Sequence, residues 1–146
     1  MELMRKLSVA VLLSVAATSA AYADEVDYKA TLTPSAEVLP TTSTGTGSVD
    51  AKLDTSSKTL KWTVNYAGLT GPATMAHFHG PAAVGKNAAP AVTVKVPEAA
   101  KGESVTGEAT LTDAQMADLQ GGNWYFNVHT KKNPAGEIRG QLMPSH

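Results

Sequence analysis

Alternation of apolar and polar residues with a period of two places the strongest constraint on the fold of this chain. It is clearest in Leu60–Tyr66, where every second residue is large and apolar and the residues between are Lys, Thr and Asn. Successive side chains of a β-strand point to opposite faces of a sheet, so this segment reserves one face for a core. Val26–Leu32 and Val49–Leu53 alternate in the same way.

Further short segments of this kind follow along the chain. We expect strands at Thr74–His79, Val92–Val96, Ser104–Leu111, Trp124–Thr130 and Glu137–Met143. Stretches rich in Gly, Pro, Asn and Ser separate them, including a long expected loop between the first two strands. About seven or eight such strands predict an all-β fold, an antiparallel Greek-key-like β-sandwich of superoxide-dismutase or immunoglobulin-like architecture.

One short helix is expected among the strands, near residues 112–120. Thr112 and Gln115 form a capping box at its start, and Gly121 is placed to end it. No linker divides the chain, so we expect a single domain over residues 24–146.

The first 23 residues have the layout of a secretory signal peptide. Arg5 and Lys6 precede the apolar run Leu7–Ala17, and Ala21–Ala23 fits a small-residue cleavage site. We expect cleavage after Ala23 and a secreted or periplasmic protein. The apolar run is short for a membrane span and no later segment approaches its length, so no span is expected after cleavage.

Charge and cysteine content exclude several classes of function. The chain has 12 basic and 13 acidic residues and no basic run in the expected mature part, which argues against nucleic-acid binding and a polybasic membrane patch. It has no cysteine, which excludes thiol catalysis and thiolate metal sites. A metal would have to be bound by His, Met, carboxylate or backbone oxygen.

The expected strand Thr74–His79 carries two histidines on one face. His77 and His79 point together with Met75, away from the apolar Phe78. Same-face neighbours on a strand stand about 6–7 Å apart, close enough for two imidazoles to bind one ion. Imidazole suits copper, zinc, nickel and iron, and a thioether adds a preference for copper(I).

A third histidine, His129, lies in the strand Trp124–Thr130 and shares its face with Tyr125 and Asn127. If the two strands are neighbours, three imidazoles meet on one patch. The last expected strand adds Arg139 and Gln141 to the same polar face, with Met143 next on that side of the strand. A solvated sheet face is the alternative, but such faces usually carry Lys, Glu and Thr, so we predict a metal or ligand site.

Other polar residues are less specific. Glu37 and Glu137 stand near turns, where either could complete a metal shell or simply hold a loop in place. No Gly-rich phosphate loop, serine nucleophile elbow or recognisable pair of catalytic carboxylates is present. An enzyme is therefore not the expected class.

A set of motifs along the chain resembles, in the same order, the motifs of a known family. They are Ala36–Pro40, Thr44–Gly47, Gly68–Leu69, His77–Pro81, Asn127–Thr130, Asn133–Pro134 and Gly136–Leu142. The chain resembles the chordin-type (CHRD) domain from about Val26 to Met143, and its terminal block is the most specific part. One departure is Leu39, where the family usually has a second proline before Pro40.

The resemblance implies an all-β sandwich that is secreted, or periplasmic in bacteria. In animals such domains occur in an extracellular antagonist of growth factors, which makes protein binding a plausible role, and no general enzymatic activity comes with the family. The matching positions that it carries over as a site, with their chemistry left open, are His77, His79, His129, Glu37, Glu137 and Arg139. A superoxide dismutase centre is not expected, because the chain has only four histidines and no cysteine.

Three hypotheses remain. The first is an exported, non-catalytic sandwich that binds copper or zinc through its three central histidines. The residues expected to add a ligand or surround the site are Met75, Glu37, Tyr125, Asn127, Glu137 and Arg139. The second is an extracytoplasmic protein- or glycan-interaction module with a structural histidine network and no metal. The third is an enzyme that uses an open metal position.

Overall fold

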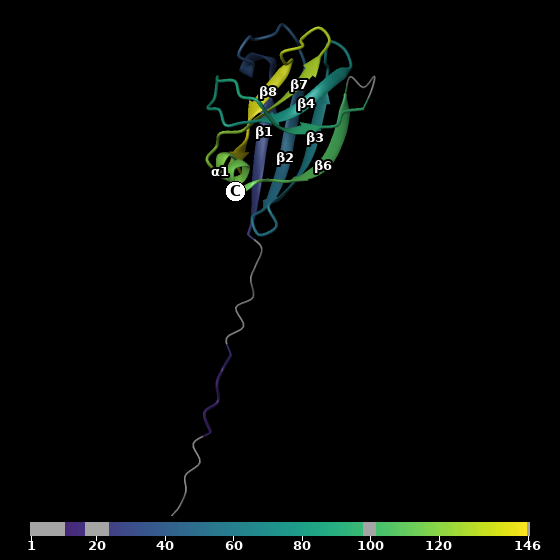
Figure 1. Cartoon of the computed structure of the whole chain (residues 1–146). Coiled ribbons are helices and arrows are strands. Elements are labelled where there is room, and N and C mark those ends of the chain that lie inside the picture. The colour runs from purple at the N-terminus through teal and green to yellow at the C-terminus, as the bar shows by residue number, and fades with distance from the viewer. Residues whose placement is uncertain (1–10, 17–23, 98–101, 146) are drawn as a thin grey trace, which may run out of the picture.

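The computed structural model describes residues 11–16, 24–97 and 102–145. Within them, nine strands form two antiparallel sheets that lie face to face (Figure 1). The all-β sandwich expected from the sequence is confirmed. The expected cleavage site after Ala23 lies outside the described residues. Among the described helices, none has the length and apolar character needed to cross a membrane.

Sheet A has five strands in the order β6-β3-β2-β1-β9. They are β1 (Glu25–Leu32), β2 (Thr46–Asp54), β3 (Thr59–Ala67), β6 (Glu103–Thr110) and β9 (Met143–Pro144). Sheet B has four strands in the order β5-β4-β7-β8. They are β4 (Ala73–His79), β5 (Pro90–Val94), β7 (Tyr125–Thr130) and β8 (Ile138–Gln141). A short 3-10 helix, η1 (Pro34–Ala36), and the helix α1 (Asp113–Gln120) complete the described elements.

The core lies between the two sheets and follows the predicted alternation. The burial of β3 alternates strictly from Leu60 to Tyr66, with every apolar residue of that stretch buried. Trp62 of sheet A meets Phe78 of sheet B edge to face, with ring centroids 5.2 Å apart. Phe78 also packs on Phe126 of the neighbouring strand at 4.8 Å. The apolar faces of β4 and β7 are thereby fixed inward, which sends their histidines to the outer face of sheet B.

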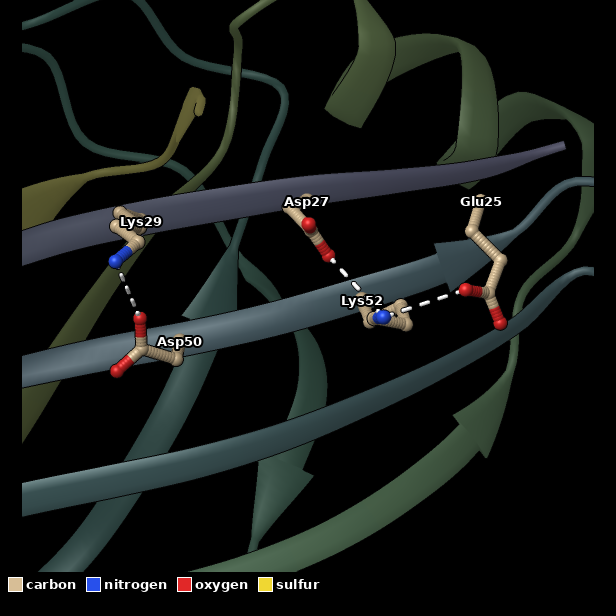
Figure 2. Close-up of polar contacts among 5 residues, drawn as sticks. All are labelled: Glu25, Asp27, Lys29, Asp50 and Lys52. Atoms are coloured by element: carbon tan, nitrogen blue, oxygen red, sulfur yellow. Dashed lines mark hydrogen bonds and ion pairs between the residues drawn. The ribbon is translucent and has the colours of Figure 1, made fainter. Parts of the chain in front are cut away.

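The outer face of sheet A is a solvated, charged surface. Figure 2 shows its cross-strand ion pairs, Lys29 with Asp50 at 3.4 Å and Lys52 with Glu25 at 3.2 Å. Lys52 also lies 3.7 Å from Asp27, and all these side chains are more than half exposed. Exposed pairs of this kind contribute little to stability but keep the face soluble.

The capping box of α1 is confirmed. Thr112 accepts a hydrogen bond from the Gln115 backbone, and the Gln115 side chain accepts one from the Thr112 backbone. Gly121 is the C-cap as expected, but its backbone is right-handed, with φ of −75°. The left-handed residue that turns the chain is the next one, Gly122, with φ of 77°.

The strand expected at Glu137–Met143 is two strands in the structure. β8 belongs to sheet B, whereas β9 pairs with β1 in sheet A. Leu142 lies between them, fully buried, and its N–H donates to the Trp124 carbonyl at 3.0 Å. The chain changes sheets at this residue, so Met143 does not share a face with Arg139.

Candidate metal centre

The three histidines come together because β4 and β7 are neighbouring central strands of sheet B. The register pairs Met75 with His129 and His77 with Asn127, so His77 and His129 are diagonal neighbours on one face. One ring nitrogen each of His77, His79 and His129 lies within 4.8 Å of the other two. The adjacency on which the predicted site depended is therefore present.

His77 and His129 direct ring nitrogens at each other. His77 Nδ1 lies 3.3 Å from His129 Nε2. The other nitrogen of His129, Nδ1, lies 2.9 Å from the Pro134 carbonyl oxygen and donates its hydrogen there. In the neutral ring, His129 Nε2 then carries a lone pair that accepts a hydrogen bond from His77 Nδ1, and a bound ion would take the place of that hydrogen.

Both ring nitrogens of His79 lie within hydrogen-bond distance of an oxygen atom. Its Nδ1 lies 2.9 Å from the Ala88 carbonyl oxygen and its Nε2 lies 2.8 Å from Asn127 Oδ1. The ring also stacks on Tyr125, with centroids 4.6 Å apart and planes 6° from parallel. This imidazole is the most constrained of the three.

Burial favours the neutral form of two of the rings. It lowers the pKa of His77, and the neighbouring His129 and His79 lower it further. Burial also lowers the pKa of His79, although the hydrogen bonds with Ala88 and Asn127 partly oppose this. A histidine must be deprotonated to bind a metal, so the lowered pKa values reduce competition from protons.

The β4–β5 loop (residues 80–89) covers this face. Tyr125 donates its hydroxyl hydrogen to the Ala88 carbonyl at 3.2 Å. The Arg139 guanidinium lies 3.5 Å from the Tyr125 ring centroid and donates to Asn87 Oδ1 at 2.9 Å and to the Lys86 carbonyl. A stack of Arg139, Tyr125 and His79 therefore runs across the sheet beneath the loop. These contacts of the loop carbonyls with the polar face were not predicted from the sequence.

The part of the outer face of sheet B that carries the histidines, Tyr125, Asn127 and Arg139 is consequently buried, so the solvated-face alternative is wrong for these residues. Eight polar or charged described residues are buried in the molecule: Glu37, His77, His79, Asn127, His129, Thr130, Glu137 and Arg139. Met75 is different, since its side chain is 47% exposed at the edge of the cluster. Gln141 anchors the loop by donating to the Ala82 carbonyl at 3.0 Å.

Glu37 lies near Asn127 and Arg139 and is outside the group of possible ligand atoms found in the described residues. A Cβ added at Gly136 would lie 2.5 Å from Glu37 Oε1 and 2.6 Å from Asn127 Nδ2, which places both groups over that glycine. Glu37 Oε1 is buried without a hydrogen-bond partner. Burial raises the pKa of Glu37 to about 7, against the opposing effects of the Arg139 charge and the Asn127 amide.

Glu137 fixes loops, the second of the two roles that the sequence left open. It is fully buried and is likewise outside the possible ligand group of the described residues. Its carboxylate accepts hydrogen bonds from the Thr70 backbone and hydroxyl, Ser43, Thr130 and Asn133. Burial raises the pKa of Glu137, but these hydrogen bonds outweigh that effect and lower it overall.

Most of the donors to Glu137 were not identified from the sequence. Thr70 and Ser43 lie in distant loops, and nothing local marks them as its partners. The short segment from Thr130 to Asn133 carries a usable signal, because a threonine hydroxyl commonly accepts from a nearby backbone N–H in a turn. In the structure the Asn133 N–H donates to Thr130 Oγ1 at 3.2 Å.

Comparison with known proteins gives one match. The family model described as CHRD domain matches residues 28–142, a stretch that includes the three histidines and both glutamates. Neither the curated proteins nor the solved structures contain a match.

Proposed function

This chain belongs to the CHRD domain family, and from that premise we propose that it is an exported, non-catalytic binding module for a transition-metal ion. The ion, copper or zinc, would be held in the cluster of His77, His79 and His129. One observation carries the proposal: the three residues place ligand atoms within 4.8 Å of one another. Export is inferred from the layout of the first 23 residues.

The spacing of two ring nitrogens supports a shared ion. Metal–imidazole bonds of about 2.0–2.1 Å in a tetrahedral site separate two ligand nitrogens by about 3.3–3.4 Å. The separation of His77 Nδ1 and His129 Nε2 is 3.3 Å. The bond from His129 Nδ1–H to the Pro134 carbonyl is also typical of a metal-binding histidine, whose second nitrogen usually donates to an oxygen.

Burial favours an ion over a larger ligand. His77, His79 and His129 are only 9%, 7% and 7% exposed, and the β4–β5 loop lies over part of the face. A protein or glycan could touch little of these rings, and an organic substrate would find little room. The interaction-module hypothesis would therefore have to use another surface, and the histidines would then form a structural network.

The test is titration of the purified protein with Cu(I), Cu(II) and Zn(II), followed by calorimetry. We expect one ion per chain in the wild type, and binding weakened about a hundredfold or more in His77→Ala and His129→Ala, since each removes a ligand. The matched control is His146→Ala, which removes the remaining histidine of the chain and should leave this site unaffected. Equal binding by all four proteins, or none by the wild type, would rule out the cluster as the metal site.

A further inference from the structure

We infer that the ion is copper(I), bound by His77 Nδ1, His129 Nε2 and the thioether of Met75, and that His79 is a positioning residue. This inference rests on the proposed metal function and assigns its ligands and its ion. It differs from a three-histidine site in one ligand, and that difference changes which metal the site prefers.

Both ring nitrogens of His79 already face oxygen atoms, so His79 is the least available of the three histidines as a ligand. Both ring nitrogens lie within 2.9 Å of carbonyl oxygens, those of Ala88 and Asn127. A neutral imidazole has one N–H, so His79 donates a hydrogen bond at one of these nitrogens, and at the other the carbonyl oxygen occupies the position that a metal ion would need. Coordination through His79 would force one of these two oxygens to move away and lose its neighbour in a buried site.

The Asn127 amide is held in the orientation that accepts from His79. Its Nδ2 lies with the Glu37 carboxyl group over Gly136, and Asn127 lowers the pKa of Glu37, as an amide nitrogen facing that group would. This leaves Oδ1 facing His79 Nε2 at 2.8 Å. These contacts therefore fix the Asn127 side chain, and for this reason His79 is not assigned as a metal ligand.

Met75 occupies the third ligand position by register. It pairs directly with His129 across β4 and β7, and it is two residues before His77 on the same strand face. Direct cross-strand neighbours have Cβ atoms about 4.5–5.5 Å apart, which a flexible methionine side chain spans easily. Met75 is also a large apolar side chain left 47% exposed, beside three buried imidazoles.

The ligand chemistry selects the ion. A thioether is a soft ligand that favours copper(I), whereas zinc prefers imidazole, thiolate and carboxylate. The two carboxylates near this face are outside the ligand group of the described residues, and the chain has no cysteine. Two imidazoles and one thioether therefore suit copper(I) better than zinc.

His79 acts by holding its neighbours. Its ring packs edge to face on His77, with centroids 5.3 Å apart, while its other side stacks on Tyr125 beneath Arg139. His77 is thereby held with Nδ1 directed at His129. Loss of His79 should loosen this geometry without removing a ligand.

The first experiment measures anaerobic Cu(I) affinity against a chromophoric Cu(I) chelator, and Zn(II) affinity in parallel. Met75→Leu should weaken Cu(I) binding about tenfold or more and change Zn(II) binding less than about twofold. The matched control is Met143→Leu, because Met143 is 54% exposed but lies in β9 of the other sheet. Cu(I) affinity unchanged by Met75→Leu would overturn the thioether assignment.

The second experiment separates the roles of the histidines. His77→Gln should weaken Cu(I) binding about a hundredfold or more, whereas His79→Gln should weaken it about tenfold, as expected for a residue that orients a ligand. X-ray absorption of the copper-loaded wild type should show one sulfur and two imidazole ligands, and His79→Gln should have the same ligands.

Equal losses of Cu(I) affinity in His77→Gln and His79→Gln, or three imidazole ligands in the wild type, would overturn the assignment of His79 while leaving the metal function intact. Failure of the wild type to bind any of the ions would remove both proposals.

Discussion

At the level of single residues, two buried carboxylates have opposite electrostatic environments. The Glu137 carboxylate accepts five hydrogen bonds, which lower its pKa despite burial. Glu37 has one oxygen without a partner, and burial raises its pKa to about 7. Charge on Glu137 therefore stabilises the fold, whereas charge on Glu37 opposes it.

This difference predicts how Glu37 links stability to pH. The raised pKa means that the folded protein binds a proton more tightly than the unfolded chain, whose carboxyl titrates near 4.5. The contribution is fully present below that value and is lost as the pH rises through about 7. At pH 8, Glu37→Gln should be more stable than the wild type by up to about 3 kcal/mol.

Urea unfolding at acidic and alkaline pH measures this effect. The gain from Glu37→Gln should shrink toward zero as the pH approaches 4.5, where the wild-type carboxyl is neutral in both states. A variant that is less stable than the wild type at pH 8 would show that the Arg139 charge compensates Glu37 fully.

The opposite outcome is expected for Glu137. Glu137→Gln places an amide among hydroxyl and N–H donors from Thr70, Ser43 and Asn133, so several lose their acceptor. We expect the free energy of unfolding to fall by about 3 kcal/mol at neutral pH, measured by urea unfolding. The matched control is Glu108→Gln on the exposed face of β6, which should change stability by less than about 0.5 kcal/mol. Similar effects of the two variants would contradict the loop-fixing role.

At the level of elements, burial explains both what the sequence predicted and what it missed. The strands β1 to β4 were predictable because each has one face in the core and the alternation records that face directly. The division between β8 and β9 was not, because the alternation continues through Leu142 while the chain passes from one sheet to the other. The alternation of apolar and polar residues indicates which face of a strand is buried, but it does not indicate which sheet the strand belongs to.

The candidate site shows the same limit. The shared face of His77, His79 and His129 followed from strand periodicity, and only the pairing of β4 with β7 had to be assumed. The burial of that face depends on loop carbonyls such as that of Ala88. Backbone carbonyls have no sequence signature, so the role of His79 was not visible in the chain.

The contact between β8 and β1 gives a prediction about the packing of the sheets. Gly140 lies so close to β1 that an added Cβ would clash with the Thr31 carbonyl oxygen and meet Leu32 Cδ2 at 3.2 Å. The backbone bonds between Thr33 and Arg139, at 2.9 and 3.0 Å, hold the strands at this separation. Gly140→Ala should therefore destabilise the protein by about 3 kcal/mol or more.

Thermal unfolding of Gly140→Ala compared with Gly71→Ala checks this packing. An added Cβ at Gly71 would meet no atom within 4 Å, so that variant should unfold at nearly the wild-type temperature. Equal stability of the two variants would mean that β8 can move away from β1 at little cost.

At the level of the whole molecule, the two outer faces of the sandwich have different roles. Sheet A presents exposed ion pairs to water, as in Figure 2, whereas the polar face of sheet B is covered and hydrogen-bonded. The apolar core between the sheets is separate from both. Histidine chemistry can therefore change on one face without disturbing the packing that holds the fold.

Because the histidine face is separate from the core, metal binding should raise the free energy of unfolding without changing the fold. A ligand that binds only the folded state adds about 2.7 kcal/mol when its free concentration is a hundred times its dissociation constant. For a domain of this size, the melting temperature should rise by roughly 5–15 °C. The rise in melting temperature should persist just below the ordinary histidine pKa of 6.5, because burial lowers the pKa of His77. It should fade at more acidic pH as protons displace the ion.

Thermal unfolding of the wild type and His129→Ala, with and without anaerobic Cu(I), measures this rise. An equal rise in both proteins would place the ion elsewhere on the molecule, because His129→Ala removes the lone pair that faces His77.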